Sequence, residues 1–394
     1  MRLPTASSGN SLAHSLLATA QQLAPRVAAR SEEIEAARRL PADLAQELAQ
    51  AGFFRMFIPE AYGGLELHPA RIIEIIEELS RADASTGWCV MIGSATAMIS
   101  AWLPEATARA IFEPQETITG GVAAPIGRAE RVEGGYRISG RWSWASGSQN
   151  CQWLVGGAVI TQGGKPVLSP KGIPEMRTLV FPARDAVLHD TWHASGLCGT
   201  GSCDMEVKEL FVPEAYSLSL VSERPRVARP LYGFPAFGLL GVGLPAVALG
   251  IARRALDEFV TLAQQKVMYP SRKLLATRPA VQQTVAEAEA LLRSARALLH
   301  ESVHQAFDAG ARGELTVRTR ADLRLSYTHA TRASARVVDL VYEAAGGPAV
   351  FRTSPLQRCF RDVHVATHHA MVAAPTLETI GGVLLGQETE TSLL

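Results

Sequence analysis

Apolar positions divide the chain into three stretches, and the first has a helical pattern. From Leu12 to about Leu103, apolar residues recur at three- and four-residue intervals, as they do along one face of a helix. Proline and glycine punctuate this pattern, so that Pro41 starts one helix and Gly52 ends it. The spacing predicts an N-terminal helical domain over residues 1–116.

The second stretch alternates apolar and polar residues in short runs. Residues 135–144 and 203–212 are clear examples, and glycine-rich turns separate such runs between about Thr117 and Glu214. Alternation of this kind is typical of strands that bury one face. We therefore expect a small central β domain over residues 117–230.

Helical spacing returns beyond Pro245. Four long amphipathic segments, bounded by proline or glycine, cover residues 246–269, 279–309, 314–345 and 354–386. Helices of this length joined by short connections suit a bundle. The pattern predicts a C-terminal four-helix bundle over residues 231–394, and a chain that is mainly α with a central β domain.

The composition limits the classes of partner that this protein is expected to bind. Lysine plus arginine and aspartate plus glutamate both number 38, so no excess charge draws the surface toward nucleic acid or an anionic membrane. No stretch approaches the roughly 18 uninterrupted apolar residues of a membrane span. The five cysteines are scattered without CxxC pairs, which suits reduced thiols. We expect a cytoplasmic protein that binds neither nucleic acid nor membrane.

Four segments carry a family resemblance. They are Ser-Thr-Gly-Trp at 85–88, Ala-Ala-Pro-Ile-Gly-Arg-Ala at 123–129, Trp-Ala-Ser-Gly-Ser at 144–148 and Arg-Asp-Val-His-Val-Ala-Thr-His-His at 361–369. With them, the chain resembles the acyl-CoA dehydrogenase superfamily along nearly its whole length. More narrowly, it is similar to oxygenase components of two-component flavin-dependent monooxygenases, such as 4-hydroxyphenylacetate hydroxylases, steroid-ring hydroxylases and dibenzothiophene monooxygenases. The resemblance implies an N-terminal helical domain, a β-barrel domain and a C-terminal four-helix bundle, assembled as a homotetramer.

The same resemblance assigns residues that bind the flavin. Relatives have Trp-x-Thr/Ser where this chain has Trp144 to Ser146, so that Trp144 would line the flavin ring and Ser146 would hydrogen-bond its nitrogen 5. A hydroxyl group suits that nitrogen because it can both donate and accept a hydrogen bond. The plain alternative is a tryptophan- and serine-rich strand and turn of the β domain. Further flavin contacts implied in this way are Ala123, Ala145, Trp88, Thr200 and Ser202.

The last helical segment departs from the dehydrogenases. The commonest dehydrogenases have a glutamate base eight residues after the aspartate of an Arg-Asp pair, and counting from Asp362 gives Ala370. Alanine cannot take a proton, so desaturation by the usual base is excluded. The neighbouring His369 matches a histidine that in the monooxygenase branch helps to form or hold a flavin hydroperoxide, since an imidazole can stabilise anionic oxygen. His364 and His368 fit ordinary exposed or satisfied histidines better.

The remaining implied contacts concern other parts of the flavin. Arg272 matches an arginine that the scaffold supplies to the flavin phosphate of a neighbouring subunit, and an exposed helix-end arginine is an equal alternative. Gly346 and Gly347 match a glycine pair near the cofactor, although a helix-ending turn explains them as well. Cys198 stands where relatives have an arginine, in the segment Leu-Cys-Gly-Thr-Gly-Ser at 197–202, so the charge contact of those relatives is not expected.

Residues 300–304, His-Glu-Ser-Val-His, match the HExxH zinc motif on a predicted helix. A zinc site would need a third ligand, which Glu314, Asp322 or His329 could supply by its place in the sequence. The motif explains five residues, whereas the flavin resemblance covers nearly the whole chain. We therefore expect no metal, and we interpret His300 and His304 as sharing one exposed helix face.

The resemblance implies an enzyme that receives reduced FMN or FAD from a separate reductase, since no nicotinamide-binding GxGxxG follows a predicted strand. It would use O2, through a flavin hydroperoxide beside the catalytic residues His369 and Ser146, to oxygenate a small apolar aromatic or heteroaromatic substrate, phenol- or indole-like. Trp88, Met91 and Phe237 are candidate walls of a pocket that excludes water. Two alternatives stay open: an acyl-CoA dehydrogenase or oxidase with a displaced base, and a non-catalytic flavin-fold scaffold.

Overall fold

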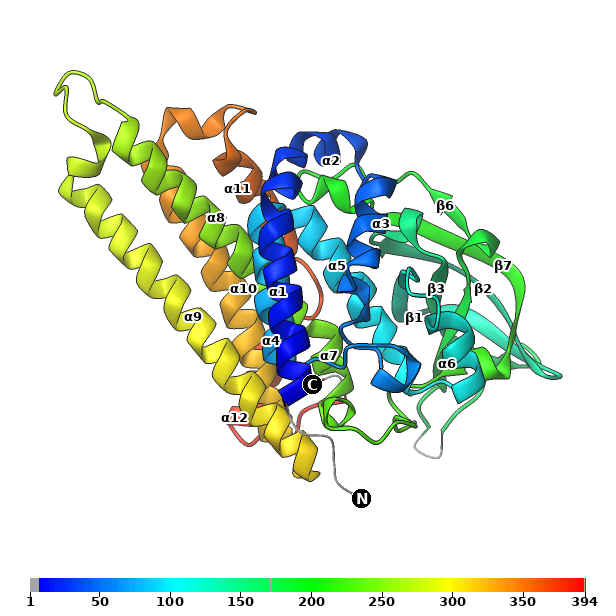
Figure 1. Ribbon diagram of the computed structural model, residues 1–394. Coiled ribbons are helices and arrows are strands. Elements are labelled where there is room, and N and C mark those ends of the chain that lie inside the picture. The colour runs from blue at the N-terminus through cyan, green and yellow to red at the C-terminus, as the bar shows by residue number, and fades with distance from the viewer. Residues whose placement is uncertain (1–6, 170–171, 393) are drawn as a thin grey trace.

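In the computed structural model, long helices occupy one side of the molecule and a β-sheet the other (Figure 1). The structure describes residues 7–169, 172–392 and 394. This arrangement confirms the predicted fold class, mainly α with a central β domain. The N-terminal helices are α1 (Ser7–Ala29), α2 (Ser31–Ala37), α3 (Ala42–Gln50), α4 (Pro69–Ala82), α5 (Ala84–Ala97) and α6 (Glu105–Phe112).

The described strands form one eight-stranded sheet in the order β6-β7-β2-β1-β3-β5-β8, with β4 paired to β3. Its main pairings are antiparallel, except that β1 runs parallel to β3. A bulge between Val122 and Gly127 interrupts the ladder of β1 with β3 and leaves Ala123 exposed. The strands are β1 (Thr119–Val132), β2 (Gly135–Ala145), β3 (Trp153–Gln162), β4 (Lys165–Pro166), β5 (Met176–Pro182), β6 (Val187–His189), β7 (Cys203–Pro213) and β8 (Ser217–Leu218).

Trp142 lies at the centre of the β-domain core. Its ring is fully buried, and its Nε1 donates a hydrogen bond to the Gly157 carbonyl at 2.9 Å. Gly127 and Gly140 make room for the ring, because a Cβ at either position would lie 2.4 or 2.5 Å from it. Replacing a buried side chain of this size by alanine costs about 3–5 kcal/mol. This packing fixes the end of β2, which leads directly into Ser146.

Helix α5 joins the bundle to the β domain. Asp83 caps its N terminus by accepting hydrogen bonds from the Thr86 backbone N–H at 2.8 Å and from the Thr86 hydroxyl at 2.9 Å. Nearly every residue of α5 is buried, because the helix contacts the bundle on one side and the β domain on the other. Trp88, in the second turn of α5, therefore lies between these two parts of the molecule.

Three of the four predicted bundle helices are continuous, namely α8 (Gly243–Gln265), α9 (Pro279–Arg312) and α10 (Val317–Ala345), and the short α7 (Ala236–Gly241) precedes them. The prediction of one helix over residues 354–386 is wrong. Instead, α11 (Pro355–Ala366) ends before His369, and α12 (Thr376–Leu384) begins after Pro375. Proline has no N–H for the helical ladder and disfavours helical backbone in the residue before it. The break places His369 in a turn between two helices.

The segment Ala236–Gln265 is the one candidate membrane span among the described residues, by length and composition alone. In its most apolar window, 78% of the segment is buried inside the protein. There α8 packs against α4, α10 and α11. Its apolar character is therefore that of a core helix of the bundle.

Candidate functional site

A chain of hydroxyl groups ends at Ser146. This buried serine follows the last residue of β2. Its Oγ accepts a hydrogen bond from Trp88 Nε1 at 3.0 Å and lies 2.7 Å from Ser202 Oγ. Ser202 Oγ in turn lies 2.6 Å from Thr200 Oγ1, which donates to the Leu197 carbonyl at 2.8 Å. The fold thus brings four of the predicted flavin-binding residues together from α5, the residue after β2 and the segment before β7.

Counting donors fixes the direction of each bond in this chain. A hydroxyl group has one proton and two acceptor lone pairs. Thr200 uses its proton on the Leu197 carbonyl, so Ser202 donates to Thr200 and Ser146 donates to Ser202. Ser146 also accepts from Trp88, which leaves it one lone pair. Ser146 is therefore set to accept a hydrogen bond from an incoming N–H group.

His369 lies beside Trp88 in the turn after α11. The two ring centroids are 5.8 Å apart and the ring planes meet at 66°. His369 Nδ1 accepts a hydrogen bond from the Met371 backbone N–H at 3.3 Å, so the neutral ring carries its proton on Nε2. Burial lowers the pKa of His369 to about 4, and the charge of Arg324 contributes to this lowering. At neutral pH the side chain is an uncharged hydrogen-bond donor.

Arg324 was not identified from the sequence as a site residue. Its side chain lies on α10 and is only 5% exposed. Its Nη1 donates to the Met371 carbonyl at 3.1 Å, in the same turn as His369. The spacing of Ala321, Arg324 and Thr328 along α10 is the signal that could have placed this arginine on a buried face.

The other histidines of this segment are engaged elsewhere or exposed. His364 Nε2 forms a hydrogen bond with Asp339 at 2.8 Å, and its ring meets Phe360 edge-on. His368 is exposed, as is Ala370, the residue at the position of the dehydrogenase base. Within this turn, His369 is the histidine whose ring contacts Trp88, and Trp88 in turn donates a hydrogen bond to Ser146.

Trp144 turns outward at the end of β2. Its side chain is 70% exposed, and its backbone φ of 66° lies in the left-handed region that residues other than glycine rarely adopt. Strain of this kind is concentrated at binding sites. Ala123 is exposed on the bulge of β1, whereas the methyl group of Ala145 lies in the β-domain core. Ala145 can therefore offer a ligand only its backbone.

Arg272, Gly346 and Gly347 are all exposed. Arg272 lies in the loop between α8 and α9, which Figure 1 shows at the end of the bundle remote from the sheet. Lys266 Nζ donates to the Ala345 carbonyl at 2.9 Å and ties the start of this loop to the end of α10. A single chain thus does not bring Arg272 to Ser146.

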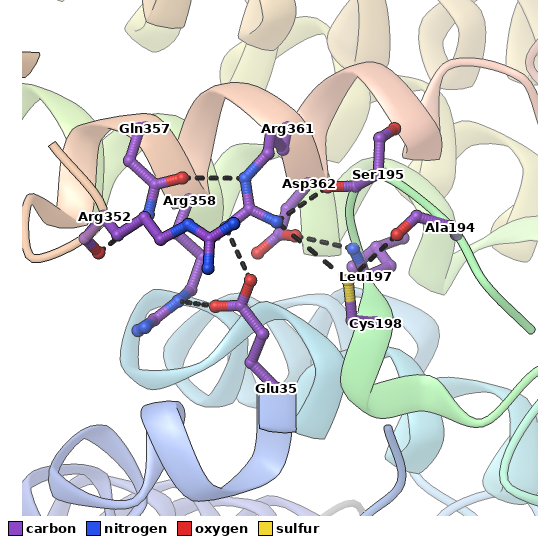
Figure 2. Close-up of polar contacts among 10 residues, drawn as sticks. All are labelled: Glu35, Ala194, Ser195, Leu197, Cys198, Arg352, Gln357, Arg358, Arg361 and Asp362. Atoms are coloured by element: carbon purple, nitrogen blue, oxygen red, sulfur yellow. Dashed lines mark hydrogen bonds and ion pairs between the residues drawn. The ribbon is translucent and has the colours of Figure 1, made fainter. Parts of the chain in front are cut away.

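Polar contacts fasten α11 to the segment that precedes η6 (Cys198–Thr200), as Figure 2 shows. Asp362 Oδ1 accepts a hydrogen bond from the Leu197 backbone N–H at 2.6 Å, and Arg361 Nη1 donates to the Ser195 carbonyl at 2.7 Å. From the other side, Glu35 of α2 pairs with Arg361 at 2.6 Å. The helix that leads to His369 is therefore joined to the segment that carries Thr200.

The three side chains predicted to line a substrate pocket lie in different parts of the structure. Trp88 lies beside His369, as described above. Met91 is buried between α5 and α8, where a Cβ on Gly243 would come within 2.2 Å of it, so Met91 is a core residue. Phe237 is half-buried on α7. A narrow cavity behind Ser146 is lined by Cys89, Gly93 and Cys151, among others.

Of the two HExxH histidines, His304 is exposed as expected, whereas His300 is half-buried, so the interpretation of one exposed face is wrong for His300. His304 on α9 lies against His68, with ring centroids 4.9 Å apart, and His68 also packs on Phe307 at 4.1 Å. The candidate third ligands Glu314 and Asp322 are ion-paired with nearby arginines. The described residues contain no group of three or more histidine, cysteine or acidic side chains placed to hold a metal ion.

The five cysteines are all free thiols. Burial raises the pKa of Cys89, and it raises the pKa of Cys151 and of Cys359 to about 12. The pKa of Cys198 is also raised, mainly by burial, although Arg361 Nη1 lies 4.0 Å from its sulfur. These four groups are therefore protonated, weakly nucleophilic thiols.

Comparison with known proteins identifies the family to which the chain belongs. Two family models match it: the acyl-CoA dehydrogenase N-terminal domain at residues 13–112 and the acyl-CoA dehydrogenase C-terminal domain at residues 242–374. An indole-3-acetate monooxygenase of Pseudomonas putida is 34% identical over 91% of both chains. The oxygenase component of an FADH2-dependent resorcinol hydroxylase of a Rhizobium species is 30% identical over 91% of both.

A solved structure agrees with these relatives. The HsaA monooxygenase of Mycobacterium tuberculosis superimposes with a TM-score of 0.89 at 27% identity, covering 97% of this chain and all of the other. The match spans the helical domains, the sheet and the bundle, and so includes the elements that carry Ser146 and His369. The chain belongs to the acyl-CoA dehydrogenase superfamily, in its group of flavin-dependent monooxygenase oxygenase components.

Proposed function

We propose that this protein is the oxygenase component of a two-component flavin-dependent monooxygenase, which uses reduced flavin and O2 to insert one oxygen atom into a small apolar aromatic or heteroaromatic compound. One observation carries the proposal. Trp88 joins the acceptor hydroxyl of Ser146 to the donor ring of His369, so groups of complementary hydrogen-bonding character face one site. The relatives named above support the same reaction class.

The residues present fit a flavin. When bound, the flavin supplies the electrons that activate dioxygen. Trp144 offers it a large exposed ring, and Ser146 offers a lone pair that can accept from the N–H of a reduced ring nitrogen. Both reduced FMN and reduced FAD remain in the proposal, since these contacts concern the part of the molecule that the two flavins share.

His369 and Arg324 provide what reduced oxygen needs from the protein. A neutral imidazole can donate its Nε2 proton in a hydrogen bond to anionic oxygen, and it stays neutral because its pKa is near 4. The guanidinium of Arg324 adds positive potential behind it. A hydrogen bond to a charged group contributes about 1.5–3 kcal/mol. Trp88, itself buried, helps to keep water from this place.

The partners follow from this chemistry. A separate reductase would supply the reduced flavin, and the substrate would be an indole-like or phenolic compound. We further propose a cytoplasmic homotetramer assembled through the bundle. Exposed apolar side chains at the end of the bundle support such an assembly, namely Tyr269 at 95%, Phe351 at 64% and Val350 at 63% exposure.

The decisive experiment mixes the protein anaerobically with reduced FMN or FAD, adds oxygen rapidly, and follows near-ultraviolet absorbance in the presence of indole-3-acetate, indole or resorcinol. A transient band followed by an oxygenated product supports the proposal. Flavin oxidation at its rate in free solution, with no product, contradicts it. Bleaching of the oxidised flavoprotein by an acyl-CoA would instead favour a dehydrogenase, and flavin binding without any reaction would favour a scaffold.

A further inference from the structure

The two proposed catalytic side chains are linked by a closed circuit of contacts. From Ser146 the hydroxyl chain runs to Leu197, whose backbone N–H donates to Asp362 at 2.6 Å. Asp362 lies on α11, and the turn that follows this helix carries His369. The ring of His369 contacts Trp88, which returns the circuit to Ser146. Asp362 and His369 are the two ionisable side chains in this circuit.

Leu197 is held in a conformation that it would not adopt unaided. Its φ of 49° and ψ of 34° are left-handed, which disfavours a residue with a side chain. Its N–H is bound by Asp362, and its carbonyl accepts from Thr200 Oγ1 at 2.8 Å and from Trp192 Nε1 at 3.0 Å. Just before it, Gly196 allows close approach, because a Cβ there would come within 2.3 Å of the Arg361 carbonyl. The strained residue is therefore fixed at both ends.

Asp362 occupies a costly position. The side chain is buried, and burial raises its pKa to about 7, with the nearby Asp83 adding to the rise. An ionised carboxyl group in such surroundings costs stability rather than adding to it. An apolar residue would avoid this cost but would leave the buried Leu197 N–H without an acceptor. The carboxyl group is better explained by the backbone N–H that it holds.

We propose that Asp362 is a positioning residue for the oxygenation reaction: by binding the Leu197 N–H it fixes the hydroxyl chain that orients Ser146, and it locks this chain to the helix that places His369. The inference rests on the proposed function for its effect on the reaction. The positioning itself is a property of the protein alone and can be measured without flavin.

Three variants separate positioning from general loosening of α11. Asp362→Ala removes the acceptor, and Asp362→Asn keeps an acceptor oxygen in the same place without the charge. Glu35→Gln is the matched control, because Glu35 binds Arg358 and Arg361 of the same helix but has no contact with Leu197 in Figure 2. Hydrogen–deuterium exchange of residues 194–203 in the flavin-free protein reports on the positioning. The ratio of oxygenated product to O2 consumed reports on the reaction.

We expect the amide hydrogens of residues 196–202 to exchange about tenfold faster or more in Asp362→Ala, because the buried Leu197 N–H is left without an acceptor. The product ratio of this variant should fall by a similar factor in favour of hydrogen peroxide. Asp362→Asn and Glu35→Gln should match the wild type in both measurements. Unchanged exchange in Asp362→Ala, or an equal loss in Glu35→Gln, would overturn the proposal.

A fourth variant covers failure of Asp362→Ala to accumulate. Asp362→Glu keeps the carboxyl group but moves it by one methylene group, so exchange should increase and the product ratio should fall while the protein stays folded. A wild-type product ratio in Asp362→Glu would contradict positioning. If the wild-type protein oxygenates no substrate, the proposed function fails, and the exchange data still decide whether Asp362 fixes Leu197.

Discussion

His369 carries no charge at neutral pH, because burial and the nearby Arg324 lower its pKa to about 4. An imidazole can stabilise anionic oxygen either as a cation or as a neutral hydrogen-bond donor, and the structure favours the second. With Nδ1 occupied by the Met371 N–H, only Nε2 is free to donate a hydrogen bond. The positive charge of this site thus belongs to Arg324, which stands behind the ring.

At the residue scale we predict that His369→Ala leaves flavin affinity within a few-fold of the wild type. The yield of oxygenated product per O2 consumed should fall about ten- to a hundredfold, since one hydrogen bond to charged oxygen is lost. Hydrogen peroxide should account for the difference. Product analysis with a peroxide assay measures both quantities.

His368→Ala is the matched control, because His368 is adjacent to His369 in the sequence and its side chain is exposed. It should retain the wild-type yield. A wild-type yield in His369→Ala would remove His369 from the mechanism, and an equal loss in both variants would point to disturbance of the turn.

At the scale of elements, periodicity predicted most of the helices and strands because each buries one face. The strands expected at residues 135–144 and 203–212 are β2 and β7. The helix expected over residues 354–386 is broken, and Pro375 was a signal for the start of α12. The site could be predicted only in part, because Trp88 and Ser146 meet across 58 residues of sequence and no local pattern encodes that contact. Motif resemblance supplied the residues, and packing decided their geometry.

Two histidines near the contact of α4 with α9 lead to a prediction about the stability of the protein in acid. Burial lowers the pKa of His68 and of His300 to about 4, below the ordinary value of 6.5, so the folded protein favours their neutral forms. Their contribution to stability is fully present above pH 6.5 and is lost as pH falls toward 4. His300→Leu removes one of these groups, whose buried Nε2 has no partner among the described residues. Its Tm should fall several degrees less than that of the wild type between pH 7 and about pH 5.

Thermal unfolding at several pH values tests this expectation. His368→Leu serves as the control, since it removes an exposed histidine and should follow the wild-type curve. Parallel curves for His300→Leu and the wild type would show that His300 does not contribute to the loss of stability in acid.

At the scale of the whole molecule, the residues expected to bind one flavin lie at two distant places. Ser146 is hydrogen-bonded to Trp88 of α5, which lies between bundle and β domain, while Arg272 lies in the loop between α8 and α9, at the end of the bundle remote from the sheet (Figure 1). Both groups can serve one flavin only if Arg272 reaches the site of another subunit. This geometry is what the proposed homotetramer would provide.

We predict that Arg272→Ala keeps the oligomeric mass of the wild type but weakens flavin binding about tenfold or more, as expected for loss of a charge-assisted phosphate contact. Titration with reduced flavin, together with light scattering, measures the two quantities. Lys273→Ala removes a neighbouring exposed charge and should have little effect. Wild-type affinity in Arg272→Ala would place this arginine outside the flavin site.

The state of the thiols bears on how long such an enzyme can work. Any turnover that fails to reach substrate would release hydrogen peroxide beside the protein's own side chains. Peroxide oxidises the thiolate form of cysteine, and the buried, protonated Cys89, Cys151 and Cys359 present almost none of it. Burial of these three thiols therefore protects the protein from oxidation by the hydrogen peroxide that it would itself release.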